Sequence, residues 1–134
     1  MEDWENLFSS YLNSGVYSIG NSSGIRLIRK AGFLNGLDFT HINLSKVIDK
    51  SSFLKTVASA LKFPSYFGMN WDALNDCLTD MSWKPAGGYI IFFANCKSIS
   101  ENLAAEIEII RNIFNSSAQY WRQKKVQFYI ILSE

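Results

Sequence analysis

Apolar and polar residues follow two different periods along this chain, one typical of strands and the other typical of helices. Short apolar or alternating runs predict strands at 15–20, 38–44, 89–93 and 126–132. Apolar residues at helical spacing predict helices at 2–12, 22–32, 51–62, 70–81 and 101–121. Because strands alternate with helices and are mostly apolar, the expected fold class is α/β, with a parallel sheet and helices packed on its faces.

Capping and helix-breaking residues set the expected limits of two of these helices. Ser22 or Ser23 is expected to cap the second helix, and Gly32 to end it. Ser51 or Ser52 is expected to cap the third. The third helix should end before the segment FPSYFG, which begins at 63, because the residue ahead of Pro64 is disfavoured in the α region.

The stretch 63–83, FPSYFGMNWDALNDCLTDMSW, reads as a tight loop that leads into a short helix. Pro64 and Gly68 interrupt the chain before the helix, and Asn70 is a good N-cap residue. Four apolar residues of the helix share one side and are expected to face the core: Leu74, Cys77, Leu78 and Met81.

The opposite side of this helix is acidic. Asp72, Asp76 and, nearer its edge, Asp80 lie at i, i+4 and i+8, with Asn75 and Thr79 between them and no Lys or Arg in 63–83. Like charges at this spacing destabilise a helix by about 0.2–0.5 kcal/mol per pair. A solvated face with a first-turn Asp explains Asp72, but the two later carboxylates are better explained by a basic partner.

Composition narrows the possible functions. With 134 residues, 48% hydrophobic content and a net charge of +1, the chain is expected to be one domain that does not bind nucleic acid through gross charge. It has no apolar run long enough to span a bilayer, and its N-terminus is acidic where a signal peptide is basic. We therefore expect a cytoplasmic protein without a membrane partner. Cys77 and Cys96 are expected to be reduced, buried thiols rather than a disulfide or a metal pair. The single histidine, His41, has no metal-binding or catalytic pattern around it.

The segment YFGMNWDALNDCLTD, followed by an apolar strand, a long helix and a C-terminal VQFYIILS strand, resembles the barstar family of intracellular ribonuclease inhibitors. The likeness extends from near Phe39 to the end. It implies a single barstar-like domain over 1–134 with a parallel sheet of three to four strands, in two or three layers. Residues 1–38 would be an N-terminal extension that adds a strand and one or two helices to a core at 39–134.

The resemblance also implies a partner surface made of the loop and the acidic helix. Asp76 corresponds to the family's main inhibitory aspartate, and Asp72 to the second one. Tyr66 and Phe67 correspond to the aromatic pair that packs against the enzyme, and Gly68 to the tight turn. The implied partner is a barnase-like ribonuclease or ribonuclease toxin, bound without a cofactor by an inhibitor that is monomeric when free.

Of the remaining positions, some match the family pattern and others depart from it. Asn70 matches the cap and Thr79 a contact at the helix end. Asn75 stands where a tryptophan contact is found, Asp80 replaces a glycine, and Ser116 aligns near a glutamate of the last helix.

Two alternatives to inhibition remain. The first is a barstar-like module that binds another basic partner. The second is an enzyme that uses paired carboxylates as acid and base. Carboxylates on adjacent turns of one helix do not flank a substrate, and the sequence contains no Gly-rich phosphate loop or nucleophile elbow. We therefore expect no enzymatic activity.

Overall fold

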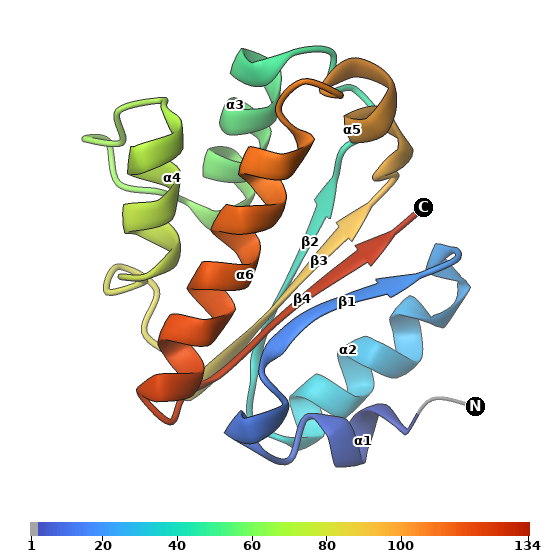
Figure 1. Ribbon diagram of the computed structural model, residues 1–134. Coiled ribbons are helices and arrows are strands. Elements are labelled where there is room, and N and C mark those ends of the chain that lie inside the picture. The colour runs from blue at the N-terminus through green and yellow to red at the C-terminus, as the bar shows by residue number, and fades with distance from the viewer. Residues whose placement is uncertain (1–2) are drawn as a thin grey trace.

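The computed structural model describes residues 3–134 and contains one parallel sheet (Figure 1). Its strands are β1 (Gly15–Ile19), β2 (Asp38–Asn43), β3 (Gly88–Ala94) and β4 (Gln127–Ser133). They lie in the order β1-β4-β3-β2, and every neighbouring pair is parallel. The prediction of an α/β fold with a parallel sheet is confirmed, and the sheet has four strands.

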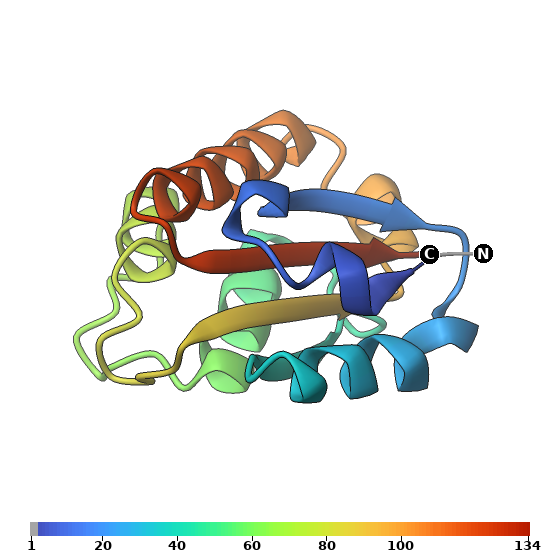
Figure 2. The same ribbon diagram turned by 90° about the horizontal axis from the view of Figure 1, so that it is seen from below.

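Helices cover both faces of this sheet, so the fold has three layers (Figure 2). They are α1 (Trp4–Leu7), α2 (Ile25–Leu34), α3 (Lys50–Leu61), α4 (Trp71–Leu78), α5 (Lys97–Asn102) and α6 (Ile107–Gln123). Short 3₁₀ helices are formed by Tyr11–Asn13 and Ser22–Gly24. None of the helices in the described part of the chain has the length and apolarity needed to cross a membrane.

Two apolar cores form because successive strand residues point to opposite faces of the sheet. Ile91 and Phe93 of β3 belong to the core beneath α3, α4 and α6, whereas Ile90 and Phe92 belong to the core beneath α1 and α2. All seven residues of β3 are buried, as expected for a central strand of a parallel sheet with both faces covered.

The first helix is shorter than predicted. A helix was expected over 2–12, but α1 ends at Leu7, and the expected residue 2 lies outside the described part. Ser9 Oγ donates to the Asn6 carbonyl at 2.6 Å, and Ser10 Oγ accepts from the Leu12 amide at 3.1 Å. These local side-chain bonds replace the helical backbone bonds and divide the segment into two short turns.

The limits predicted for the helix over 101–121 are also wrong, because this range contains the end of one helix and most of another. α5 ends at Asn102 and α6 begins at Ile107. Asn102 Nδ2 donates to the Val47 carbonyl at 2.9 Å, and Leu103, just beyond, is buried to 1% exposure with non-helical φ and ψ of −127° and 35°. Burial of Leu103 and the tie to Val47 therefore favour a break that periodicity alone does not reveal.

Two predicted caps and one predicted stop are wrong as well. Asp49, rather than a serine, caps α3, and Ser52 completes a capping box with it. Gly24 stands at the N-cap of α2 without a side-chain bond, so neither predicted serine caps that helix. α2 continues past Gly32, which is buried. A Cβ atom added to this residue would lie only 2.5 Å from Ile90 Cδ1. That glycine serves close packing between helix and sheet.

Candidate functional site

Helix α4 begins where the sequence predicted. The Asn70 side chain accepts a hydrogen bond from the Ala73 amide at 2.7 Å, which satisfies one of the free N–H groups of the first turn. The loop before it is closed by a bond from the Phe67 amide to the Pro64 carbonyl at 3.0 Å. Cap and loop together give the helix a defined starting point.

The apolar side of α4 faces the core as predicted. Leu74, Cys77 and Leu78 of α4 have exposures of 0, 5 and 0%, and Met81, which lies beyond the end of the helix, is also buried, to 1%. Trp121 of α6 donates its Nε1 hydrogen to the Leu78 carbonyl at 2.7 Å, so the neighbouring helix holds the C-terminal end of α4. With one side fixed in this way, the direction of the opposite side is also fixed.

That opposite side presents carboxylates to solvent. Asp72 and Asp76 are exposed on adjacent turns of α4. Asp80 is also exposed, but it lies beyond the helix, which ends at Leu78 with Thr79 as C-cap. The expectation that Asp80 occupies a third helical turn is therefore wrong. The chain leaves the helix there because Met81 enters the core in a left-handed conformation with φ 54°.

No cation of the described residues forms an ion pair with these three carboxylates. The ion pairs within residues 3–134 join Lys84 to Asp38 at 3.4 Å and Arg111 to Glu108 at 2.9 Å. Burial raises the pKa of the Cys77 thiol, and the nearby charges of Asp80 and Asp76 raise it further. The three carboxylates, which form no ion pair within residues 3–134, thus give this side of α4 a negative electrostatic potential.

The loop before α4 separates the two aromatic residues that the resemblance paired. Tyr66 is 75% exposed, whereas Phe67 is half-buried with its ring 4.9 Å from that of Phe63. The residue with positive φ in this loop is Met69, at 53°, directly before the cap Asn70. Tyr66 is therefore the aromatic side chain of this loop that is free to reach a partner.

Asn75 and Thr79 lie at the side of α4 that approaches α6. Ser116 Oγ donates to Asn75 Oδ1 at 3.5 Å, and Thr79 Oγ1 donates to the Asn75 carbonyl at 2.9 Å. Asn75 and Ser116, two positions at which the resemblance implies a departure from the family pattern, therefore contact each other. A neutral polar edge borders the acidic side of the helix here.

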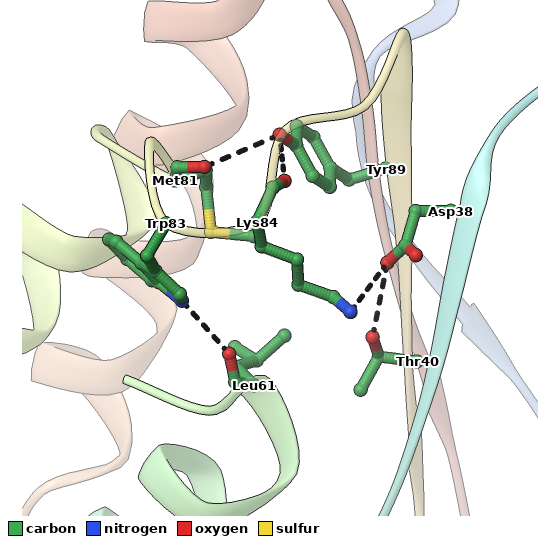
Figure 3. A network of polar contacts seen from close by, with 7 residues as sticks. All are labelled: Asp38, Thr40, Leu61, Met81, Trp83, Lys84 and Tyr89. Atoms are coloured by element: carbon green, nitrogen blue, oxygen red, sulfur yellow. Dashed lines mark hydrogen bonds and ion pairs between the residues drawn. The ribbon is translucent and has the colours of Figure 1, made fainter. Parts of the chain in front are cut away.

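The contacts that anchor the loop after α4 to the sheet have no local signal in the sequence (Figure 3). Tyr89 donates its hydroxyl hydrogen to the Lys84 carbonyl at 2.6 Å, and Lys84 Nζ pairs with Asp38 of β2 at 3.4 Å. Trp83 Nε1 donates to the Leu61 carbonyl at 3.1 Å. The loop is thereby joined to β2, β3 and α3, which holds Asp80 and the end of α4 in place.

The fold and this surface define a class, that of small parallel α/β proteins with a short acidic helix exposed beside the sheet. The chain belongs to the barstar family, because the family model described as Barstar (barnase inhibitor) matches residues 37–133. No curated protein matches the chain. Within residues 3–134, His, Cys, Asp and Glu do not gather in groups of three or more that could hold a metal ion.

Proposed function

We propose that this protein inhibits a basic ribonuclease by occupying its active site with α4 and the loop that carries Tyr66. The observation that supports the proposal most strongly is the pair of exposed carboxylates, Asp72 and Asp76, one turn apart and without an ion-pair partner within residues 3–134. The match to a family described as barnase inhibitor makes a ribonuclease the first partner to test.

The proposed mechanism follows from the chemistry of a ribonuclease cleft, which binds phosphates with cationic side chains. Carboxylates held one turn apart on a fixed helix accept charge-assisted hydrogen bonds from arginine and lysine as phosphates would. Tyr66 offers an aromatic face that can stack where a base stacks and exclude water from those bonds. The inhibitor acts by occupying the site, and no covalent bond forms or breaks.

In this proposal Asp76 is the principal anchor and Asp72 its neighbour, while Asp80 lies at the rim. Asn70 and Gly68 shape the entry to the helix, and Asn75 and Thr79 form its polar edge. The protein acts in the cytoplasm as a monomer, binds its partner directly, and performs no catalysis of its own.

A second candidate function is binding to a different basic protein without ribonuclease inhibition. The neutral contact between Asn75 and Ser116 supports it, because this edge lacks the tryptophan and the carboxylate of the family pattern. A partner surface that fits this edge would differ from that of a typical cognate enzyme.

The test is calorimetric titration and an RNA-cleavage assay with a barnase-like ribonuclease. We expect Asp76→Ala to weaken binding by about 2 kcal/mol or more, because truncation leaves arginines of the enzyme desolvated and unpaired. Asp80→Ala should mainly slow association and reduce its dependence on salt. Glu101→Ala is the matched control, since it removes the same charge from an exposed position on α5.

Equal binding by wild type and Asp76→Ala would exclude α4 as the inhibitory surface. Tight binding that depends on Asp76 but leaves RNA cleavage unchanged would favour the second candidate function.

A further inference from the structure

A cavity of about 490 Å³ lies on the other side of α6 from α4, at the carboxyl ends of the strands. Ile19 ends β1, Leu132 is near the end of β4, and Cys96 follows β3, and all three line the cavity. α5 and α6, which both contribute lining residues, lie on the same face of the sheet (Figure 1). Small-molecule sites of open α/β sheets are found at this end of the strands, and the volume is within their usual range.

The lining of this cavity is apolar at its floor and polar at its mouth. Ile99, Ile110 and Phe114 form the floor and are buried to 6, 3 and 1% exposure. The exposed lining residues are Ser18, Lys97, Ser100, Arg111 and Glu134. An apolar floor with a few polar groups at one side is the arrangement that holds and orients a small amphipathic ligand.

The charged side chains that line the cavity indicate which polar group the ligand would carry. The lining side chains include two cations, Lys97 and Arg111, and one carboxylate, Glu134. Arg111 is already paired with Glu108 at 2.9 Å, whereas Lys97 forms no ion pair with any residue from 3 to 134. We propose that the cavity binds a small molecule with an aliphatic body and a carboxylate end, the body on the floor and the carboxylate toward Lys97.

Cys96 provides an internal reporter for an occupant. Its thiol lines the cavity and donates to the Phe93 carbonyl at 3.4 Å, and burial raises its pKa to about 11. A raised pKa leaves little of the reactive thiolate at neutral pH, so alkylation of Cys96 is expected to be slow even without a ligand. A bound ligand should slow alkylation of Cys96 and leave that of Cys77, which lies outside the lining, unchanged.

The experiment uses the whole chain and octanoate as the probe, titrated by heteronuclear NMR, with octanol and octylamine as neutral and cationic counterparts. We expect octanoate to bind more tightly than either counterpart and to shift the resonances of Ile110 and Phe114. Lys97→Gln should weaken octanoate binding by about two- to fivefold, the effect of one exposed charge pair. Lys46→Gln, at another exposed lysine, is the matched control.

Ser18→Trp should abolish octanoate binding by filling the mouth, whereas Ser45→Trp, at an exposed serine outside the lining, should not. If Ser18→Trp fails to fold, the Lys97 comparison decides the proposal. Equal affinity for octanoate and octanol, or shifts confined to residues outside the cavity, would overturn it. Asp76→Ala should leave octanoate binding unchanged, so this proposal and the proposed inhibition are tested separately.

Discussion

Helices α4 and α2 lie on opposite faces of the sheet and expose surfaces of opposite character (Figure 2). α4 exposes carboxylates and no cation. α2 exposes three cations and three large apolar residues, which are Arg26, Arg29, Lys30, Leu27, Phe33 and Leu34. The net charge of +1 therefore describes neither helix surface, because α4 exposes only carboxylates as charged groups and α2 exposes only cations.

The two surfaces also differ in how their charges are used within the molecule. Arg29 of α2 lies over the ring of Phe39, with its guanidinium carbon 4.9 Å from the ring centroid. Asp76 of α4 forms no ion pair with any residue from 3 to 134. The matched family model begins at 37, so it includes α4 and excludes α2. A charge that contacts its own fold and a charge without an ion-pair partner among residues 3–134 can thus be told apart by their contacts.

The largest expected difference between the two helices comes from their leucines. Leu78 of α4 is fully buried, so Leu78→Ala should lower the free energy of unfolding by about 2–5 kcal/mol through lost burial and a cavity. Leu27 of α2 is 63% exposed, so Leu27→Ala should change it by less than about 0.5 kcal/mol. Urea denaturation measures both. A loss below about 1 kcal/mol for Leu78→Ala would mean that α4 is rotated from its described position.

A smaller effect should distinguish the inner side of α2. Alanine usually favours a helix over glycine by about 1 kcal/mol, but overpacking a filled core costs about 1–3 kcal/mol. We expect Gly32→Ala to be less stable than wild type, because its Cβ would lie 2.5 Å from Cδ1 of the fully buried Ile90. Gly24→Ala, with no atom within 4 Å of the added Cβ, is the control in thermal denaturation. Stabilisation by Gly32→Ala would show that the contact between α2 and the sheet is loose.

Removing one charge from each exposed surface should change stability in opposite directions. Asp76→Asn should leave stability unchanged or raise it by about 0.2–0.5 kcal/mol, since it relieves repulsion with Asp72. Arg29→Gln should lower it by about 0.5–1 kcal/mol, because the cation–π contact with Phe39 is lost. Both are measured in urea at low ionic strength. A loss of stability in Asp76→Asn would indicate that the carboxylate has a partner within its own fold.

The smallest expected effect is a change of stability with pH, caused by His41, whose pKa is influenced by Arg29 of α2. Burial, and then the nearby Arg29, lower the pKa of His41 from 6.5. The unfolded chain then binds a proton more readily, so stability should be constant above 6.5 and decrease as the pH falls through the pKa of the folded state. NMR titration of the His41 ring should show a higher pKa in Arg29→Gln and no change in Arg26→Gln. Equal pKa values in the wild type and Arg29→Gln would show that burial alone lowers it.

The sequence predicted the features of α4 that depend on local chemistry. The cap at Asn70 and the stripe of apolar residues follow from spacing and side-chain type alone, and both are present. The strands were also located closely, because β3 and β4 read as the continuous apolar runs of buried strands, whereas β2 reads as an alternation of apolar and polar residues.

What the sequence did not predict depends on partners distant in the chain. The break before α6 rests on a bond between Asn102 and Val47, 55 positions apart. The continuation of α2 through Gly32 rests on contact with Ile90. Burial of Phe67 against Phe63 could not be separated from exposure of Tyr66, because adjacent aromatic residues have the same local signal. Local patterns contain no record of these tertiary contacts.

The position of β4 in the sheet has a consequence for the order of folding. β4, at 127–133, lies between β1, at 15–19, and β3, so the first strand of the chain has the last one as its only strand neighbour within residues 3–134. During synthesis β1 cannot pair until β4 has left the ribosome, and such distant pairing is slow because a long loop must close first. Until then the edge of β3 is also open, and chains with unpaired strands are prone to aggregate. We therefore expect α4 to reach its final position on the sheet core only after β4 has been made.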